Sequence, residues 1–418
     1  MSINVSPRVM FLAVVAAIGG ILFGYDTAVI SGTTEVVKTQ FGLTTGGEGW
    51  YVGCALIGSI LGVAIAGMLS DFLGRKKTML ISAVLFSVSA IGCALCADFT
   101  QLVLFRIVGG FGIGIVSIVS PVYISEVSPA EVRGTLVSLY QLFITIGFLL
   151  AYLANYLILK GVSMAEYWRP MLGAEAIPDL LFLVLIFFIP ESPRWLAVHG
   201  QRQDNSEAWK ALREKGILTA VLIGSAIAIL GQFMGVNAVL YYGPKIFADA
   251  GFRDPLFSTV LVGVVNMLTT VLALAIIDKV GRKQLVWWGV GGMIFCLLMI
   301  GLYFLPVTSL PTWFMLTFFL LYVFCTAISI SAVVFVLLSE MYPNRVRGLA
   351  MSFAGFALWI GTYLIGQLTP WMLENLTPAG TFFLFAFMCV PYLVIMYKWV
   401  PDTTGKSLEE IEAYWKSK

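Results

Sequence analysis

The chain has 418 residues, of which 59% are hydrophobic and only 11% are charged. Soluble domains carry about 25% charged residues, so this composition excludes an ordinary soluble protein and predicts an integral membrane protein covered by lipid. The formal net charge of +2 shows no acidic or basic excess of the kind that binds nucleic acid.

Apolar runs long enough to span a bilayer, about 20 residues each, recur along the whole chain. They predict an all-α membrane protein with about twelve transmembrane helices in two pseudo-symmetric six-helix halves. The runs lie at 9–31, 50–70, 78–97, 101–123, 135–159, 170–189, 217–242, 256–277, 285–305, 312–338, 349–373 and 379–400.

The first run contains the only charged residue between Arg8 and Glu35, which is Asp26. A charge inside a bilayer is costly and marks function by default. With alternating helix directions, Arg106 in the fourth run and Glu175 in the sixth share its outer-half depth. We expect Asp26 to alternate between a proton and Arg106, because burial favours the protonated carboxyl and a nearby guanidinium the ionised one. The alternative is a fixed ion pair that only holds the helices together.

The stretch RIVGGFGIG, which begins at Arg106, superficially resembles a nucleotide-binding fingerprint. It lacks the preceding strand and the following acidic residue of that fingerprint. Its four glycines instead predict close packing between helices. They are Gly109, Gly110, Gly112 and Gly114.

Three segments of the chain occur twice at nearly one offset. DFLGRKK at 71–77 matches DKVGRK at 278–283, and SEVSPAEVRG at 125–134 matches SEMYPNRVRG at 339–348. A third match pairs PES, which starts at Pro190, with PDT, which starts at Pro401. Paired halves of this kind build the midplane binding site of many secondary transporters.

The repeats divide the chain into two homologous halves. We expect a first half at 1–195, a shortened cytoplasmic linker at 196–215, and a second half with a short cytoplasmic tail at 216–418. Placing both termini in the cytoplasm puts 19 of the 25 Lys and Arg residues on the inner side. This asymmetry follows the positive-inside rule.

The first two repeated segments fall on the inner side of the predicted membrane protein. We expect their charges to lie between the halves in an outward-open state and to act as a cytoplasmic gate. The alternative is a solvated cluster that only sets topology. The predicted gate residues are Asp71, Arg75, Glu126, Arg133, Asp278, Arg282, Glu340 and Arg347.

Amide and aromatic side chains gather late in the seventh run, within GQFMGVNAVLYYGP at 231–244. Amides hydrogen-bond hydroxyl groups and aromatic rings cover the apolar face of a sugar, so this set suits a hydroxyl-rich ligand. The alternative is a set of hydrogen bonds between helices. The candidate binding residues are Gln232, Asn237 and Tyr241, joined by Gln141, Asn266 and Trp359 from other runs.

The rest of the chain offers little reactive chemistry. The six cysteines fall in apolar runs, and the single histidine, His199, has no second metal ligand nearby. No nucleophile–base pair occurs in the apolar runs, so we expect neither an enzyme, a metal site nor a cofactor.

Together, GGILFGYDTAVISG, R-x-x-GG, PESPRW, the two G-R-K loops and PDTTGKSLEE resemble the sugar porter family of the major facilitator superfamily. The first helix looks most like that of bacterial D-xylose–proton symporters. The resemblance implies twelve helices, alternating access, Asp26 as the proton carrier and Arg106 as its partner. It also implies sugar contacts at the six candidate binding residues.

This sequence departs from the family pattern in its expected sugar site. Gly231 replaces the first glutamine of a pair, and Leu358 replaces a polar residue before Trp359. Ser331 and Phe335 replace the glycine and tryptophan of a Gly-Pro-x-x-Trp motif, whose proline is also lost. We include Phe335 among the predicted substrate contacts, and we expect the altered site to take a different or smaller substrate, or to bind weakly.

These observations predict a proton-coupled symporter for a pentose or hexose, similar to xylose. A facilitative sugar or polyol uniporter and a transport-dead sugar sensor on the same fold remain as alternatives. We expect a monomer in a bacterial inner membrane whose partners are the sugar, the proton and the lipid bilayer.

Overall fold

The structure is a computed structural model that describes residues 6–129, 132–162, 165–198, 210–212, 214–307, 309–343, 346–401 and 408–416. Among these residues the regular structure is helical, with no β-strand. Twelve helices in this part of the chain are long and apolar enough to span a membrane. Each predicted run overlaps one of them, which confirms the all-α membrane fold.

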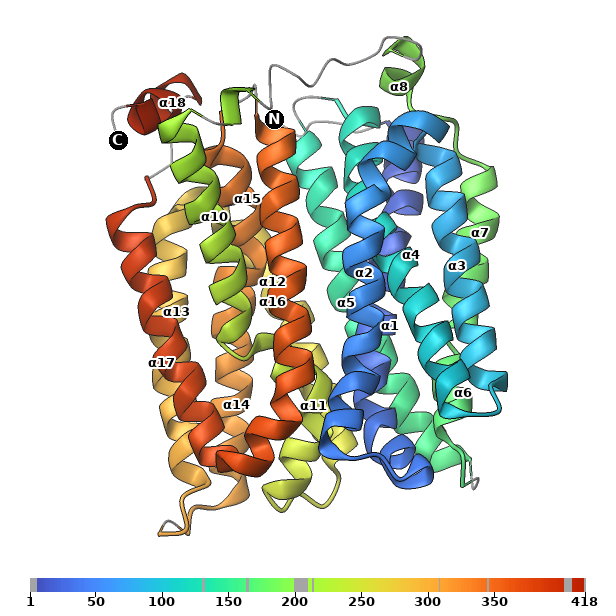
Figure 1. The fold of residues 1–418 in the computed structure, drawn as a ribbon, viewed down its shortest axis with the longest axis vertical. Helices are drawn as coiled ribbons and strands as arrows, with labels where there is room; N and C mark the ends of the chain where they lie inside the picture. Colours follow the sequence, from blue (N-terminus) through green and yellow to red (C-terminus); the bar gives the residue numbers. More distant parts are fainter. Residues whose placement is uncertain are drawn as a thin grey trace. The chain divides into compact units, whose positions relative to one another are not determined.

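The first six spans are formed by seven helices (Figure 1). Two short helices, α6 and α7, together make the sixth span, and α8 (Pro193–Val198) follows it. The seven helices are α1 (Pro7–Phe41), α2 (Thr45–Leu73), α3 (Arg75–Leu95), α4 (Phe99–Val127), α5 (Arg133–Gly161), α6 (Trp168–Gly173) and α7 (Ala176–Phe187).

The second six spans are interrupted more often. The seventh span breaks between α10 and α11, and a π-helical turn, Ala327–Ser331, separates α14 from α15. The elements are α10 (Lys215–Phe233), α11 (Val236–Asp249), α12 (Pro255–Val280), α13 (Arg282–Tyr303), α14 (Thr312–Thr326), α15 (Ala332–Met341), α16 (Arg347–Asn375), α17 (Thr377–Lys398) and the short α18 (Leu408–Lys416).

The helices gather into two compact units. Unit 1 comprises Met1–Gln201, Leu240–Lys245 and Asp254–Met267. Unit 2 comprises Arg202–Val239, Ile246–Arg253 and Leu268–Lys418. Most of the predicted linker, 196–215, lies outside the described residues.

The repeated segments adopt matching backbone conformations in the two halves. Gly74 between α2 and α3 has φ 95° and ψ 162°, and Gly281 between α12 and α13 has φ 92° and ψ 146°. A positive φ of this size favours glycine, since a Cβ atom would clash with the backbone. Val132 before α5 and Val346 before α16 also share nearly the same φ and ψ. The halves are therefore pseudo-symmetric in local structure as well as in sequence.

The glycines of α4 allow α2 and α4 to pack in close contact, as predicted. A Cβ atom added to Gly110 would lie 1.8 Å from the carbonyl oxygen of Ala55, and one on Gly114 would lie 2.3 Å from that of Ser59. Gly58 of α2 faces the backbone of α4 in the same way. Small residues bring helix backbones together where the bilayer provides no hydrophobic driving force for their association.

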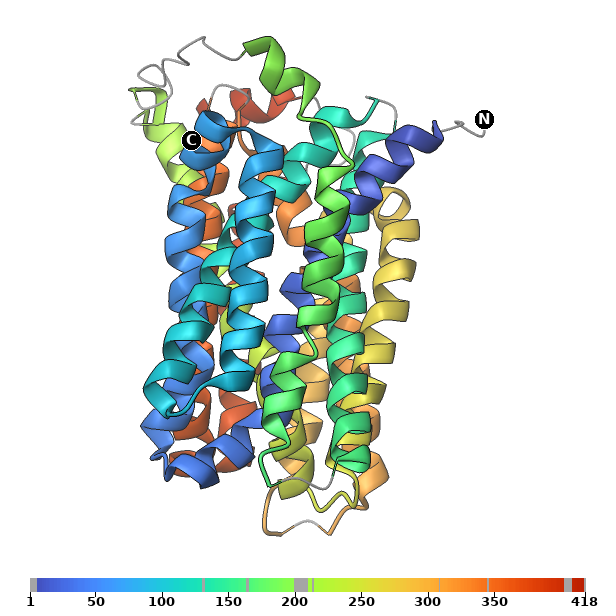
Figure 2. The ribbon, with the colours of Figure 1, turned by 90° about the vertical axis from the view of Figure 1, so that its right-hand side faces the viewer.

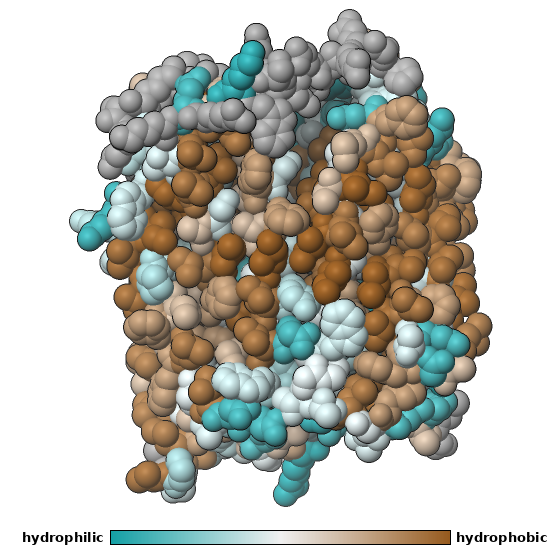
Figure 3. All heavy atoms as spheres, viewed as in Figure 1, coloured by the Kyte–Doolittle hydropathy of each residue, from teal (hydrophilic) through white to brown (hydrophobic). Residues whose placement is uncertain are grey.

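Apolar side chains dominate the face of the molecule drawn in Figure 3. Large apolar side chains such as Phe72, Leu95 and Phe188 are more than two-thirds exposed. A soluble protein rarely exposes so much apolar surface, which is consistent with a lipid-facing exterior.

Candidate functional site

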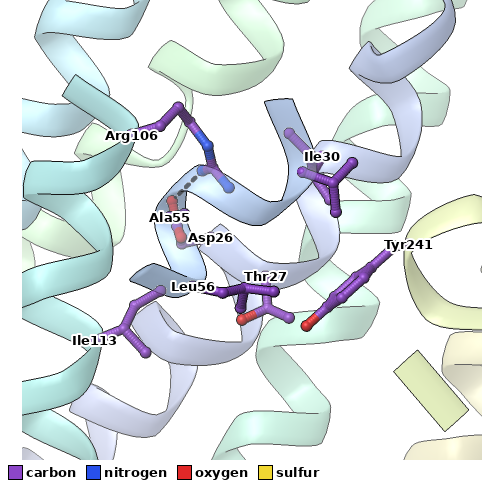
Figure 4. Close-up of a pocket in the computed structure, with 9 residues that line it drawn as sticks. Asp26, Thr27, Ile30, Ala55, Leu56, Arg106, Ile113 and Tyr241 are labelled. Carbon is purple, nitrogen blue, oxygen red and sulfur yellow. Dashed lines mark hydrogen bonds and ion pairs between the residues drawn. The ribbon is translucent and has the colours of Figure 1, made fainter. Parts of the chain in front are cut away.

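The centre of the candidate site is a buried ion pair in unit 1 between α1 and α4. The Nη1 atom of Arg106 donates a hydrogen bond of 2.5 Å to Oδ1 of Asp26 (Figure 4). Only 1% of the Asp26 surface and 2% of the Arg106 surface is exposed. The structure therefore brings together the two residues that the sequence predicted as partners.

The pair lies beside a narrow pocket that it shares with apolar side chains. Val52, Ala55 and Leu56 of α2, Ile113 of α4 and Ile30 of α1 supply most of the apolar wall. Thr27 and Tyr241 supply its other polar groups. Such a wall excludes water from the pair, which strengthens the attraction between the charges and makes an unpaired charge costly.

Helix packing places Arg106 beside α1. Gly110 lies one turn after Arg106 on α4, where a Cβ atom would lie 1.8 Å from the carbonyl oxygen of Ala55 on α2. Gly109 faces Ser89 of α3, and a Cβ atom on it would lie 3.7 Å from Oδ1 of Asp26. A larger residue at either glycine would move the guanidinium away from the carboxylate.

One oxygen of the carboxylate is not engaged by the pair. Among the described residues, Oδ2 of Asp26 and Nε of Arg106 have no hydrogen-bond partner. Oδ2 is therefore the oxygen of the carboxylate that is available for a proton.

The third predicted proton-coupling residue also lies at this site. Glu175 directly precedes α7, is buried, and interacts electrostatically with Asp26. One turn further along α7 lies Asp179, which is also buried and which our sequence analysis did not consider. The signal was present in the sequence, since an acid four positions after Glu175 faces the same side of a helix.

Two of the predicted sugar-contact residues meet in unit 2. The Nδ2 atom of Asn237 donates a 2.5 Å hydrogen bond to Oε1 of Gln232, and the hydroxyl of Thr362 donates to the same oxygen at 3.2 Å. Gly235, with φ 89°, ends the helical run between Gln232 and Asn237 and lets their side chains meet. Thr362 was missed, although it lies three residues after Trp359 on α16.

The remaining sugar-contact candidates are distributed over both units. Tyr241 is buried beside Asp26 in unit 1. Gln141 on α5 is half-buried and Asn266 on α12 is buried, both in unit 1, while Trp359 on α16 is buried in unit 2. Phe335 belongs to α15, but its side chain lies outside the described part of the chain.

The predicted gate residues form equivalent ion pairs within each unit. In unit 1, Nε and Nη2 of Arg75 each donate a 3.0 Å hydrogen bond to Glu126, and Nη1 donates to Asp71 at 2.9 Å. In unit 2, Nη2 of Arg282 lies 3.0 Å from Oε1 of Glu340. The repeated segments thus contact each other inside a unit: the arginine of D-x-x-G-R-K meets the glutamate of S-E-x-x-P.

The other gate candidates make weaker contacts. Arg133 is exposed at the start of α5, and Arg347 donates a 3.4 Å hydrogen bond to the carbonyl oxygen of Tyr342. The side chain of Asp278 lies outside the described residues. Glu191 was missed, although it belongs to the repeated PES segment: its Oε1 accepts from the backbone N–H of Arg75 at 2.8 Å.

A further buried acid lies near the start of α2, in the first turn of that helix. Glu48 of α2 is fully buried and forms salt bridges with Lys38 of α1 at 2.7 Å and with Lys245 of α11 at 2.8 Å. Sequence analysis had no signal for this cluster, because Glu48 and Lys245 are far apart in the chain.

Metal ligands do not cluster in the described part of the chain. No group of three or more His, Cys, Asp or Glu side chains there is arranged to hold a metal ion, and the six cysteines are free. The chemistry that the described residues offer is proton binding and hydrogen bonding.

Comparisons with known proteins agree along almost the whole chain. A family model described as "Sugar (and other) transporter" matches residues 12–215 and 198–415. The D-xylose-proton symporter of Escherichia coli (strain K12) is 36% identical over 98% of this chain and 96% of that protein. The glucose transporter GlcP of Staphylococcus epidermidis is 35% identical over 96% of this chain and 95% of that protein.

Solved structures give the same result for the fold. The inward open conformation of the xylose transporter XylE from E. coli matches with a TM-score of 0.85 and 36% sequence identity. The match covers 97% of this chain and 100% of that chain.

Proposed function

This chain belongs to the sugar transporter family of the major facilitator superfamily, and on that premise we propose that it is a proton-coupled sugar symporter. Its substrate is a pentose or a hexose, since relatives at similar identity are named for xylose and for glucose. The observation that carries the proposal is the buried pair of Asp26 and Arg106. A carrier that moves sugar alone has no use for a titratable carboxyl at that position.

The pair couples proton binding to conformation. An ionised Asp26 is stabilised while Arg106 is beside it, and a protonated Asp26 no longer attracts the guanidinium. A conformational change that separates the two would favour uptake of a proton, and one that brings them together would favour its release. The sugar and the proton then shift the same conformational equilibrium, between the state in which Asp26 and Arg106 are paired and the state in which they are apart. Coupling between two binding sites requires such a shared equilibrium.

The sugar site is built around the polar group of Gln232, Asn237 and Thr362. Their amide and hydroxyl groups now bond to one another, and a sugar hydroxyl can replace these bonds with bonds of its own. Tyr241, one helical turn after Asn237 in the seventh span, provides aromatic surface beside the proton site. Gln141, Asn266, Phe335 and Trp359 stay predicted sugar contacts.

The ion pairs of the repeated segments form the proposed cytoplasmic gate. They occur at equivalent places in the proposed halves, 1–195 and 216–418, so they perform the same task twice. With both termini in the cytoplasm of a bacterial inner membrane, these pairs lie on the inner side. A monomer contains both halves and is the proposed functional form.

Transport into proteoliposomes tests the proposal. Purified protein is reconstituted, and uptake of labelled xylose and glucose is measured with and without an imposed pH gradient. Wild-type protein should accumulate at least one of the sugars when the gradient is present. Accumulation that is independent of the gradient would favour a uniporter or another driving force.

The role of Asp26 is tested by Asp26→Asn in the same vesicles. The variant should lose gradient-driven accumulation but retain counterflow, in which labelled sugar exchanges for unlabelled sugar without net proton movement. Counterflow also reports how much folded carrier is present, so it serves as the internal control. Accumulation at the wild-type level would contradict the assignment of Asp26 as the proton carrier.

A further inference from the structure

A second buried carboxyl group lies next to the proton site and has no role in the function derived so far. Asp179 of α7 has no exposed surface, and neither of its oxygens has a hydrogen-bond partner among the described residues. Oε1 of Glu175, one turn earlier, is likewise without a partner in the part of the chain that the structure describes. A buried polar group without a partner is costly, so the arrangement calls for an explanation.

The surroundings of Asp179 come from the helices that α7 contacts. Helices α1 and α3 pack against α7, and Figures 1 and 2 both show α3 beside it. From α1, Asp26 interacts electrostatically with Asp179, and Tyr25 interacts with both Glu175 and Asp179. The titratable group of α3 at this site is Cys93, which interacts with Asp26 and Glu175.

The hydroxyl group of Tyr25 is a separate indication that a ligand binds here. It is 4% exposed and has no hydrogen-bond partner among the described residues, although it lies near two carboxyl groups. A phenol both donates and accepts hydrogen bonds, so it can serve a carboxyl in either protonation state.

The balance of charge identifies the ligand as a proton. Three buried carboxyls, Asp26, Glu175 and Asp179, interact with one another, and Arg106 interacts with Asp26 and Glu175. The single guanidinium is hydrogen-bonded to Asp26 and balances one negative charge, so ionised Glu175 and Asp179 would add buried charge that it does not neutralise. A metal ion is disfavoured, because the described residues hold no group of ligands arranged for one.

We propose that Asp179 is a second proton-binding site, which exchanges its proton with Asp26 through Glu175. This inference rests on the proposed symport function. When Asp26 returns to Arg106, the O–H bond of Asp179 breaks and its proton passes to water. The O–H bond of Glu175 then breaks as one forms on Asp179, and the O–H bond of Asp26 breaks as one forms on Glu175. The hydroxyl of Tyr25 can donate a hydrogen bond to Glu175 or Asp179 while that carboxyl is ionised.

The position of Asp179 gives the relay a direction. Four residues of helix advance by about 6 Å, so Asp179 lies about one turn beyond Glu175 toward the C-terminal end of α7. In the proposed orientation this is the cytoplasmic end. The relay therefore extends the proton site from Asp26 toward the side on which the proton is released.

The transport test compares Asp179→Asn with wild type. Asparagine keeps the size of the side chain but cannot carry the proton, and loss of a proton-transfer group typically lowers a rate by about 100-fold or more. We expect the ratio of gradient-driven uptake to counterflow to fall at least about tenfold. Asp179→Glu, which retains a carboxyl, should recover most of the ratio. A ratio in Asp179→Asn within twofold of wild type would overturn the proposal.

A control variant separates proton transfer from packing. Phe182, one turn beyond Asp179 on α7, is also fully buried. Phe182→Leu should lower uptake and counterflow together and leave their ratio unchanged. A fall in the ratio equal to that of Asp179→Asn would show that packing of α7 is the cause, and would overturn the relay.

Infrared spectroscopy tests proton binding without transport. Protonated carboxyl groups absorb at a C=O stretching frequency separate from that of carboxylates. Asp179→Asn should remove one such component at neutral pH, and an unchanged band would overturn the proposal. If wild-type protein shows no gradient-driven uptake, the proposed symport function fails and the relay role falls with it. The infrared band still decides whether Asp179 binds a proton.

Discussion

The Asp26–Arg106 pair makes a prediction about stability that is independent of transport. Removal of one partner from a buried, hydrogen-bonded ion pair typically costs about 3–5 kcal/mol, because the other charge remains buried. Both residues here are at least 98% buried and 2.5 Å apart, so the full range applies. We expect a smaller cost for a variant whose remaining group can become neutral.

The two single variants should therefore differ. Asp26→Asn leaves a guanidinium that cannot lose its proton, so its cost should lie near the upper end of the range. Arg106→Leu leaves a carboxyl that can take up a proton, so its cost should be lower and should fall further as the pH decreases. At about 2–4 °C for each kcal/mol, a cost near 5 kcal/mol should lower the Tm of Asp26→Asn by about 10–20 °C.

Thermal unfolding in one detergent, at several pH values, measures these differences. The double variant Asp26→Asn with Arg106→Leu removes both charges, and it should be more stable than Asp26→Asn alone. The difference between the stability loss of the double variant and the sum of the two single losses is the interaction energy that a double-mutant cycle measures. A double variant whose loss equals the sum of the two single losses would refute the reasoning, because it would show that the two charges do not stabilise each other.

Two further predictions concern helix packing and the proposed gate. Gly110→Ala forces α2 and α4 apart and should lower the free energy of unfolding by about 1–3 kcal/mol. In the control Gly67→Ala no atom lies within 4 Å of the added Cβ, so this variant should have little effect. Equal shifts of Tm in the two variants would contradict the packing argument. Glu340→Gln removes the charge that holds Arg282 and should favour the inward-open state, measured as faster labelling of single cysteine probes from the cytoplasmic side after the six native cysteines are replaced. No gain in labelling would remove Glu340 from the gate.

The transmembrane architecture could be predicted from the sequence alone. A backbone in lipid must satisfy its own hydrogen bonds, so an apolar run of sufficient length forms a helix whatever its neighbours are. Duplicated motifs such as D-x-x-G-R-K likewise repeat the same local conformation, which Gly74 and Gly281 show in their φ angles. Asp26 and Arg106 could be paired because few charges lie inside the apolar runs, so the choice of partner was small.

Only the tertiary structure decided contacts between residues far apart in the chain. Glu48 bonds to Lys245, 197 positions away, and nothing local in either segment indicates this contact. The break at Gly235 was not predicted either, because an apolar run continues through it and the bilayer tolerates irregular backbone only where other helices surround it. Asp179 was present in the sequence throughout, but its burial beside Glu175 depends on how α7 packs on α1 and α3, which apolar periodicity does not encode.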